Sequence, residues 1–185
     1  MKNSLRYKLG IHEIIGIIVG ILGFIIFDVV NDKYCIDKLF ISNCIRCVWL
    51  AAISALCGPV VGVIVGFAGS QGQVLYNGDV AWFVYSLGMS VYGLFIGRYA
   101  PKYGAREGLF IKEKIMLFNL IQSLASIIVF VFFIPLVLFL LLKGNLYELI
   151  RIGCENAVSS VLFVGVFLTI IFNLYTRLRA KYIKS

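Results

Sequence analysis

Five long runs of apolar residues alternate with short polar segments, at residues 11–30, 45–76, 80–97, 115–142 and 157–175. A helix needs about 20 apolar residues to cross a bilayer, so four of these runs suit one span each. The run at 45–76 is too long for one helix and has Gly58 and Pro59 near its centre. Proline lacks an amide donor and glycine is permissive, so this pair predicts a turn between two helices. The pattern therefore predicts six spans, at about residues 11–30, 39–57, 59–75, 80–97, 115–142 and 157–175.

Most lysine and arginine residues lie in the N-terminal segment, the loop at 98–114 and the C-terminal tail. Cytoplasmic loops of membrane proteins carry an excess of these residues, so all three segments are expected in the cytoplasm. An even number of spans must then separate the N-terminus from the loop at 98–114, and the break at Gly58 makes that number four. The prediction is an all-α membrane protein: one integral domain over residues 1–185, a compact six-transmembrane-helix bundle with cytoplasmic N- and C-termini. Its outer segments would be residues 31–43, 71–79 and 143–155.

Composition supports insertion in a lipid bilayer. Of the 185 residues, 61% are hydrophobic and 14% are charged, and the mean hydropathy is +0.98. One soluble core of this size could not bury that much apolar surface. The net charge of +8 raises the question of nucleic acid, but the basic residues lie in short stretches between apolar runs, as juxtamembrane anchors do. No nucleic-acid partner is therefore predicted.

Polar side chains are costly at membrane depth, so each is a candidate for a binding site. The predicted topology gathers six of them near the outer face: Gln71, Trp82, Tyr85, Glu155, Asn156 and Ser159. Amide groups suit a neutral polar ligand, and aromatic rings suit stacking on a planar one. A solvated helix end for Gln71 and an interfacial aromatic belt for Trp82 and Tyr85 stay open as alternatives. The longest outer segment, residues 31–43, would act as a lid.

The sequence offers no arrangement typical of a catalytic or metal centre. Cys44 and Cys47 have CxxC spacing, which is a weak signal alone, and the single histidine, His12, is distant in sequence. A disulfide among Cys35, Cys44, Cys47 and Cys154 stays open. Neither a GxxxxGK[ST] nucleotide loop nor an HExxH motif occurs. We therefore expect no enzymatic activity, no cofactor and no metal.

Small residues recur along the first predicted span, at Gly16, Gly20 and Gly23. Small residues spaced four apart let another helix approach closely. They indicate either tight packing inside the bundle or a docking face for a partner membrane protein. In the fifth span, Asn119 and Gln122 share a helical face and are predicted to hydrogen-bond to another helix.

Three segments of the chain resemble the substrate-binding S component of an energy-coupling factor (ECF) vitamin transporter. They are CGPVVGVIVGFAGSQG, AWFVYSLGMSVYGLFIG and KIMLFNLIQ. The resemblance implies a six-helix fold that binds a vitamin or vitamin precursor in an outward-facing cavity, gated by the first extracellular loop. It implies a transmembrane coupling protein and two ATPases as partners, and the plasma membrane of a prokaryote as location. In the family, the small-residue motif of the first helix contacts the coupling protein, and Gly16, Gly20 and Gly23 are the matching positions.

Two departures from the family pattern fall where a ligand is expected. Ser70 stands where a related subgroup often has histidine, and a tryptophan pair is reduced to Trp82 and Phe83. The resemblance therefore does not identify the ligand. The alternatives are a structural or assembly subunit without a small ligand, and a stand-alone secondary transporter. The second is disfavoured because spans three to six contain almost no ionisable groups and no internal repeat is evident.

Overall fold

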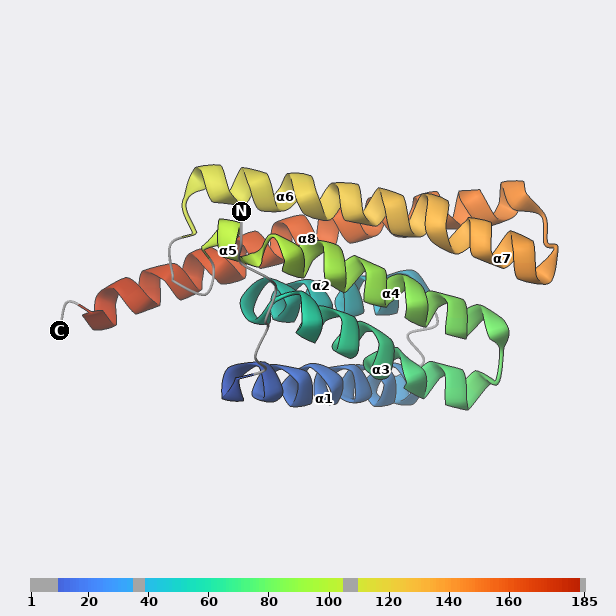
Figure 1. The fold of residues 1–185 in the computed structure, drawn as a ribbon, viewed down its shortest axis with the longest axis horizontal. Helices are drawn as coiled ribbons and strands as arrows, with labels where there is room; N and C mark the ends of the chain where they lie inside the picture. The colour runs from blue at the N-terminus through green and yellow to red at the C-terminus, as the bar shows by residue number, and fades with distance from the viewer. Residues whose placement is uncertain (1–9, 35–38, 105–109, 184–185) are drawn as a thin grey trace, which may run out of the picture.

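All regular structure in the described part of the chain is helical. The computed structural model describes residues 10–34, 39–104 and 110–183. Its elements are α1 (Ile11–Tyr34), α2 (Leu39–Cys57), α3 (Pro59–Asn77), α4 (Val80–Arg98), α5 (Ala100–Tyr103), α6 (Lys112–Ser126), the π-helix η1 (Ile127–Phe133), α7 (Ile134–Leu142) and α8 (Leu146–Ile183). Long helices run back and forth between two ends of an elongated bundle, and α6, η1 and α7 form one continuous rod (Figure 1).

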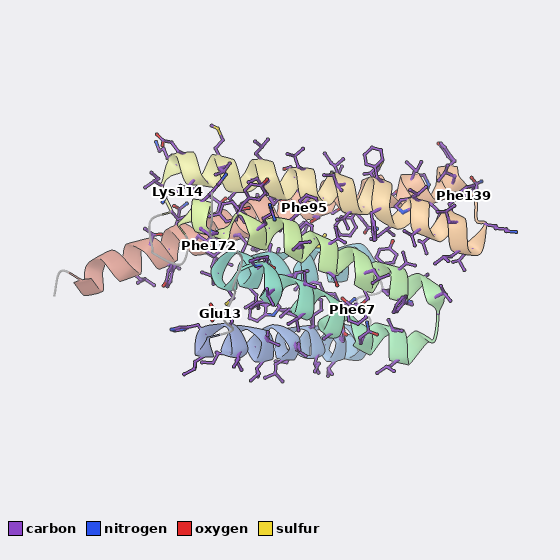
Figure 2. The ribbon with its side chains drawn as sticks, in the orientation of Figure 1. Glu13, Phe67, Phe95, Lys114, Phe139 and Phe172 are labelled. Carbon is purple, nitrogen blue, oxygen red and sulfur yellow. The ribbon has the colours of Figure 1, made fainter. Side chains whose placement is uncertain are left out.

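Four helical segments are long and apolar enough to cross a membrane: Ile11–Val30, Val80–Arg98, Lys112–Leu142 and Leu146–Thr176. Two shorter apolar segments, Asn43–Cys57 and Pro59–Gly72, lie in α2 and α3. Large aliphatic side chains project outward from α1 and α6, as Figure 2 shows. A surface of this kind suits contact with lipid, because a soluble protein would bury much of it. The all-helical, membrane-type prediction is confirmed at this level.

The break predicted in the second apolar run occurs at Gly58. Its φ of 94° lies in the region that favours glycine, and Pro59 starts α3 at a position where no amide donor is needed. α2 has the predicted bounds of 39–57. Helix extends into all three predicted outer segments, 31–43, 71–79 and 143–155. α8 already begins at Leu146, and α1 and α2 take in all of 31–43 except residues 35–38, which lie outside the described residues.

α3 and α4 form the most closely packed helix pair, because glycines meet along their contact. A Cβ on Gly62 would lie 2.5 Å from the carbonyl oxygen of Gly93, and one on Gly66 would lie 2.5 Å from that of Met89. Backbones at this separation tolerate no side chain between them. The α3–α4 hairpin is therefore a fixed frame for the side chains at its connected end.

The long rod of α6, η1 and α7 accommodates Pro135 by forming a π-helical segment directly before it. In a π-helix each amide bonds to the carbonyl five residues earlier, and Pro135 has no amide hydrogen to donate to the Phe130 carbonyl. That carbonyl faces Gly153 of α8, where a Cβ could not fit. The helix type therefore changes at Pro135, and α8 approaches closely there.

Candidate functional site

Polar and aromatic side chains from α2, α3, α4 and α8 gather at one end of the bundle. The relevant helix ends lie together there: the start of α2, the end of α3, and the starts of α4 and α8 (Figure 1). We call the residues Asn43, Gln71, Tyr85, Ser86 and Asn156 the polar cluster. The turn between α3 and α4 places the end of α3 next to the start of α4. Gly78 ends α3 in a left-handed conformation, and the Asp79 side chain accepts a hydrogen bond of 3.0 Å from the Ala81 amide at the start of α4.

Asn156 is the centre of the polar cluster. Its Oδ1 accepts a hydrogen bond from Asn43 Nδ2 at 3.2 Å, and its Nδ2 donates to the Tyr85 hydroxyl at 3.4 Å. A single amide thus connects α2, α8 and α4. All three side chains are half-buried. The cluster combines donors and acceptors that a neutral polar molecule also has.

Gln71 connects α3 to α4 beside this centre. Its Nε2 donates to Ser86 Oγ at 2.7 Å and to the Phe67 carbonyl at 3.2 Å, and Ser86 Oγ donates to the same carbonyl at 3.0 Å. Trp82 and Tyr85 are neighbouring rings whose centroids lie 6.0 Å apart with an interplanar angle of 42°. The structure therefore brings Trp82 and Tyr85 together with Asn156, whereas Gln71 lies at the same end of the bundle and pairs with Ser86.

Glu155 and Ser159 do not join that group. Glu155 is exposed and pairs with Arg151 at 2.9 Å on the outer side of α8, although we expected it to share a face with Asn156. Ser159 is buried, and its hydroxyl donates to the Glu155 carbonyl of its own helix. Adjacent helical positions point about 100° apart because a turn has about 3.6 residues. Glu155 therefore faces away from Asn156.

Deeper in the bundle, hydroxyl groups from three helices meet. Ser126 and Ser160 lie 3.1 Å apart, and Ser160 Oγ donates to the Tyr92 hydroxyl at 3.4 Å. All three residues are buried. Gln122 donates from Nε2 to the Val161 carbonyl of α8 at 3.1 Å, which confirms the predicted interhelical hydrogen bond for that residue. These groups fix α6 against α8 below the polar cluster.

Sequence reasoning missed a buried ion pair between Arg46 of α2 and Asp28 of α1. Arg46 Nη2 contacts Asp28 Oδ1, and the two side chains are 7% and 17% exposed. The Arg46 Nε is buried without a hydrogen-bond partner. A signal for the pair was available, because a charge within an apolar run is a site hypothesis by default.

The three glycines of α1 face inward. A Cβ on Gly16 would lie 2.6 Å from Cys57 Sγ, one on Gly20 would lie 2.5 Å from Val65 Cγ2, and one on Gly23 would meet the Trp49 ring. Trp49 also donates from Nε1 to the Gly20 carbonyl at 3.0 Å. In this conformation α2 and α3 cover the predicted docking face. The opposite face of α1 presents large aliphatic side chains instead.

Two further predictions concern a lid at residues 31–43 and a disulfide between cysteines. The side chains of residues 31–42 lie outside the described residues, so Asn43 is the one residue of the predicted lid whose side chain is described. Cys44, Cys47 and Cys154 are free thiols, and Cys35 lies outside the described residues. Among the candidates with described thiols, Cys44, Cys47 and Cys154 do not bond to one another.

Helices apolar enough to cross a membrane, together with bacterial homologues, indicate a multi-pass membrane protein. The homologues are UPF0397 proteins. One from Lactococcus lactis subsp. cremoris (strain NZ9000) is 28% identical over 132 residues, which cover 71% of this chain and 72% of the relative. One from Clostridium perfringens is 25% identical over 184 residues, covering 97% of this chain and 95% of the relative. No family model and no solved structure matches the chain.

Proposed function

We propose that the chain is the substrate-binding subunit of an ECF-type ABC importer. It captures a small molecule of vitamin or vitamin-precursor type at the outer face of the plasma membrane. A transmembrane coupling protein and two ATPase subunits then drive uptake. The topology that belongs to this proposal has six spans, cytoplasmic termini and the polar cluster outside. The observation that carries it is the convergence of polar and aromatic side chains from four helices at one end of the bundle.

The chemistry of the polar cluster favours a neutral, polar, planar ligand. Ligand sites combine apolar and aromatic walls with a few placed polar groups. Here Trp82 and Tyr85 supply rings, and the side-chain amides of Asn43, Gln71 and Asn156 supply donors and acceptors. Asn156 connects the three helices α2, α4 and α8. Separation of α2 from α8 at this end would release these amide groups for a ligand.

One observation favours the structural-subunit alternative. The hydrogen bonds of Asn156 and Gln71 are already made within the chain, as in a purely structural network. The two functions differ in what the purified protein retains. A binding subunit carries a small molecule or takes one up, and a structural subunit does neither.

The test is native mass spectrometry of the purified full-length chain, first for a co-purifying small molecule and then for its retention in variants. We expect Trp82→Ala and Asn156→Ala each to weaken retention at least tenfold. Glu155→Gln is the matched control, because Glu155 adjoins Asn156 in sequence but lies on the exposed face of α8. It should retain the ligand as the parent protein does. Unchanged retention in both alanine variants would refute the site, and absence of any bound small molecule in the parent would favour the structural subunit.

A further inference from the structure

A groove lies at the opposite end of the bundle from the polar cluster. It has a volume of about 720 Å³ and runs between the first turns of α3 and the last turns of α4, next to α5. Its apolar wall includes Val60, Val63 and Ile64 of α3 and Leu94 of α4. The volume lies within the range of roughly 300–1,000 Å³ that is usual for small-molecule sites. Size alone does not say what it binds.

Charge at one rim of the groove identifies the kind of occupant. Arg98 and Lys102 line it together with Tyr99. Both cations are exposed, and neither forms an ion pair with any residue that the structure describes. Lys102 Nζ lies 5.2 Å from the centroid of the Tyr99 ring, which is within the range of a cation–π contact. The groove therefore has an apolar length and a positively charged end.

The direction of the groove relative to the helices matches a lipid. Leu94 and Arg98 are four residues apart on α4, as are Val60 and Ile64 on α3, so each pair shares a face and spans about one turn. Arg98 is the last residue of the candidate span Val80–Arg98. Basic residues at the end of a span lie at the level of lipid headgroups, while the apolar part of the groove lies deeper in the membrane.

We infer that this groove binds an anionic phospholipid, with the phosphate between Arg98 and Lys102 and an acyl chain along Val63, Ile64 and Leu94. Basic pockets between transmembrane helices bind acidic headgroups in this way. The site needs only that α3 and α4 lie in a membrane, so it does not depend on the proposed transport function. A soluble phosphate would use the cations and leave the apolar wall uncovered.

The experiment measures lipid retention by the full-length protein in a neutral detergent. The protein is titrated with phosphatidylglycerol, phosphatidylcholine or glycerol phosphate, and bound molecules are counted by native mass spectrometry. We expect phosphatidylglycerol to bind at least tenfold more tightly than phosphatidylcholine, and glycerol phosphate to compete weakly. Arg98→Gln with Lys102→Gln should lower phosphatidylglycerol affinity at least tenfold, and Leu94→Trp, which fills the apolar wall, should lower it as well.

A double variant of equal charge is the matched control. Lys112→Gln with Lys114→Gln also removes two positive charges, here from the start of α6. This position is at the same end of the bundle but outside the groove, and Figure 2 labels Lys114. This control should bind phosphatidylglycerol as the parent does. The exchange Arg98→Lys with Lys102→Arg keeps both charges and should retain most of the affinity.

Three results would overturn the assignment. Equal losses in the groove variant and in the control would mean general attraction to a basic end. Equal binding of glycerol phosphate would make the ligand a soluble anion. Unchanged lipid retention, together with lost assembly with a partner protein in the groove variant, would assign the groove to that protein.

Discussion

The buried pair of Arg46 and Asp28 gives the sharpest test of how this fold is held together. In Arg46→Met the aliphatic length is nearly kept while the charge is lost, so the change falls mainly on electrostatics. Asp28 would then keep its carboxylate at a position only 17% exposed without the Arg46 guanidinium. Removing one partner of a buried ion pair costs about 3–5 kcal/mol. That loss corresponds to a roughly 100- to 5,000-fold change in the unfolding equilibrium, since about 1.4 kcal/mol is a factor of ten.

Replacing both partners separates the value of the pair from the cost of an isolated charge. In Arg46→Met combined with Asp28→Leu both charges of the pair are removed, and apolar replacements of buried pairs are often neutral. We expect the double variant to recover most of the stability that either single variant loses. Arg46→Lys, which keeps a charge without the planar guanidinium, should fall between the parent and Arg46→Met.

The assay is equilibrium unfolding in mixed micelles, followed by circular dichroism, with each variant compared at the same detergent composition. Arg151→Met is the control, because Arg151 pairs with Glu148 and Glu155 on an exposed face where ion pairs contribute little. It should unfold as the parent does. The reasoning fails if Arg46→Met loses less than about 1 kcal/mol, or if the losses of the two single variants simply add in the double variant.

Two further predictions concern backbone geometry. Gly58→Ala should destabilise the protein by about 1–3 kcal/mol through backbone strain alone, because the φ of Gly58 is 94° while a Cβ would meet nothing within 4 Å. Gly58→Ser should lose a similar amount. Thermal unfolding at the same temperature as the parent would contradict the strained turn. Gly20→Leu should lower stability by about 1–3 kcal/mol through overpacking, because a Cβ there would lie 2.5 Å from Val65 Cγ2. Val19→Leu, on the exposed face of α1, is the control and should leave stability nearly unchanged. Loss of uptake by Gly20→Leu with unchanged unfolding would instead support the docking role.

Helix boundaries could be predicted where the residues permit only one backbone conformation. Gly58 and Pro59 are such a pair, because a left-handed glycine followed by proline ends one helix and starts the next. The sequence predicted a span at 157–175, whereas α8 already begins at Leu146, because hydropathy marks the apolar part of a helix and not its polar first turns. Its first turns carry Glu148, Arg151 and Glu155, whose spacings of three and four are those of ion pairs along a helix. That signal was present in the sequence.

The partners within the candidate site could not be predicted in the same way. Asn43 and Asn156 are separated by 113 residues, and their contact depends on how α2 and α8 are rotated about their own axes. A shift of one residue moves a side chain by about 100° around a helix. For the same reason the glycines of α1 were recognisable as a smooth face, while the sequence did not tell whether α2 and α3 or another protein would cover it.

The π-helical segment η1 changes which side of the rod formed by α6, η1 and α7 is buried. Buried positions recur at Phe118, Gln122 and Ala125 before it and at Val129 within its first half, and at 3.6 residues per turn the next would fall near Phe132 and Leu136. Those two side chains are instead 63% and 55% exposed, while Ile134 and Leu138 are buried. The wider π turn takes up the difference. One rod thus presents two differently rotated faces to its neighbours, and a single-residue deletion within Ile127–Phe133 would let the segment return to an α-helix while α7 keeps the faces that it has.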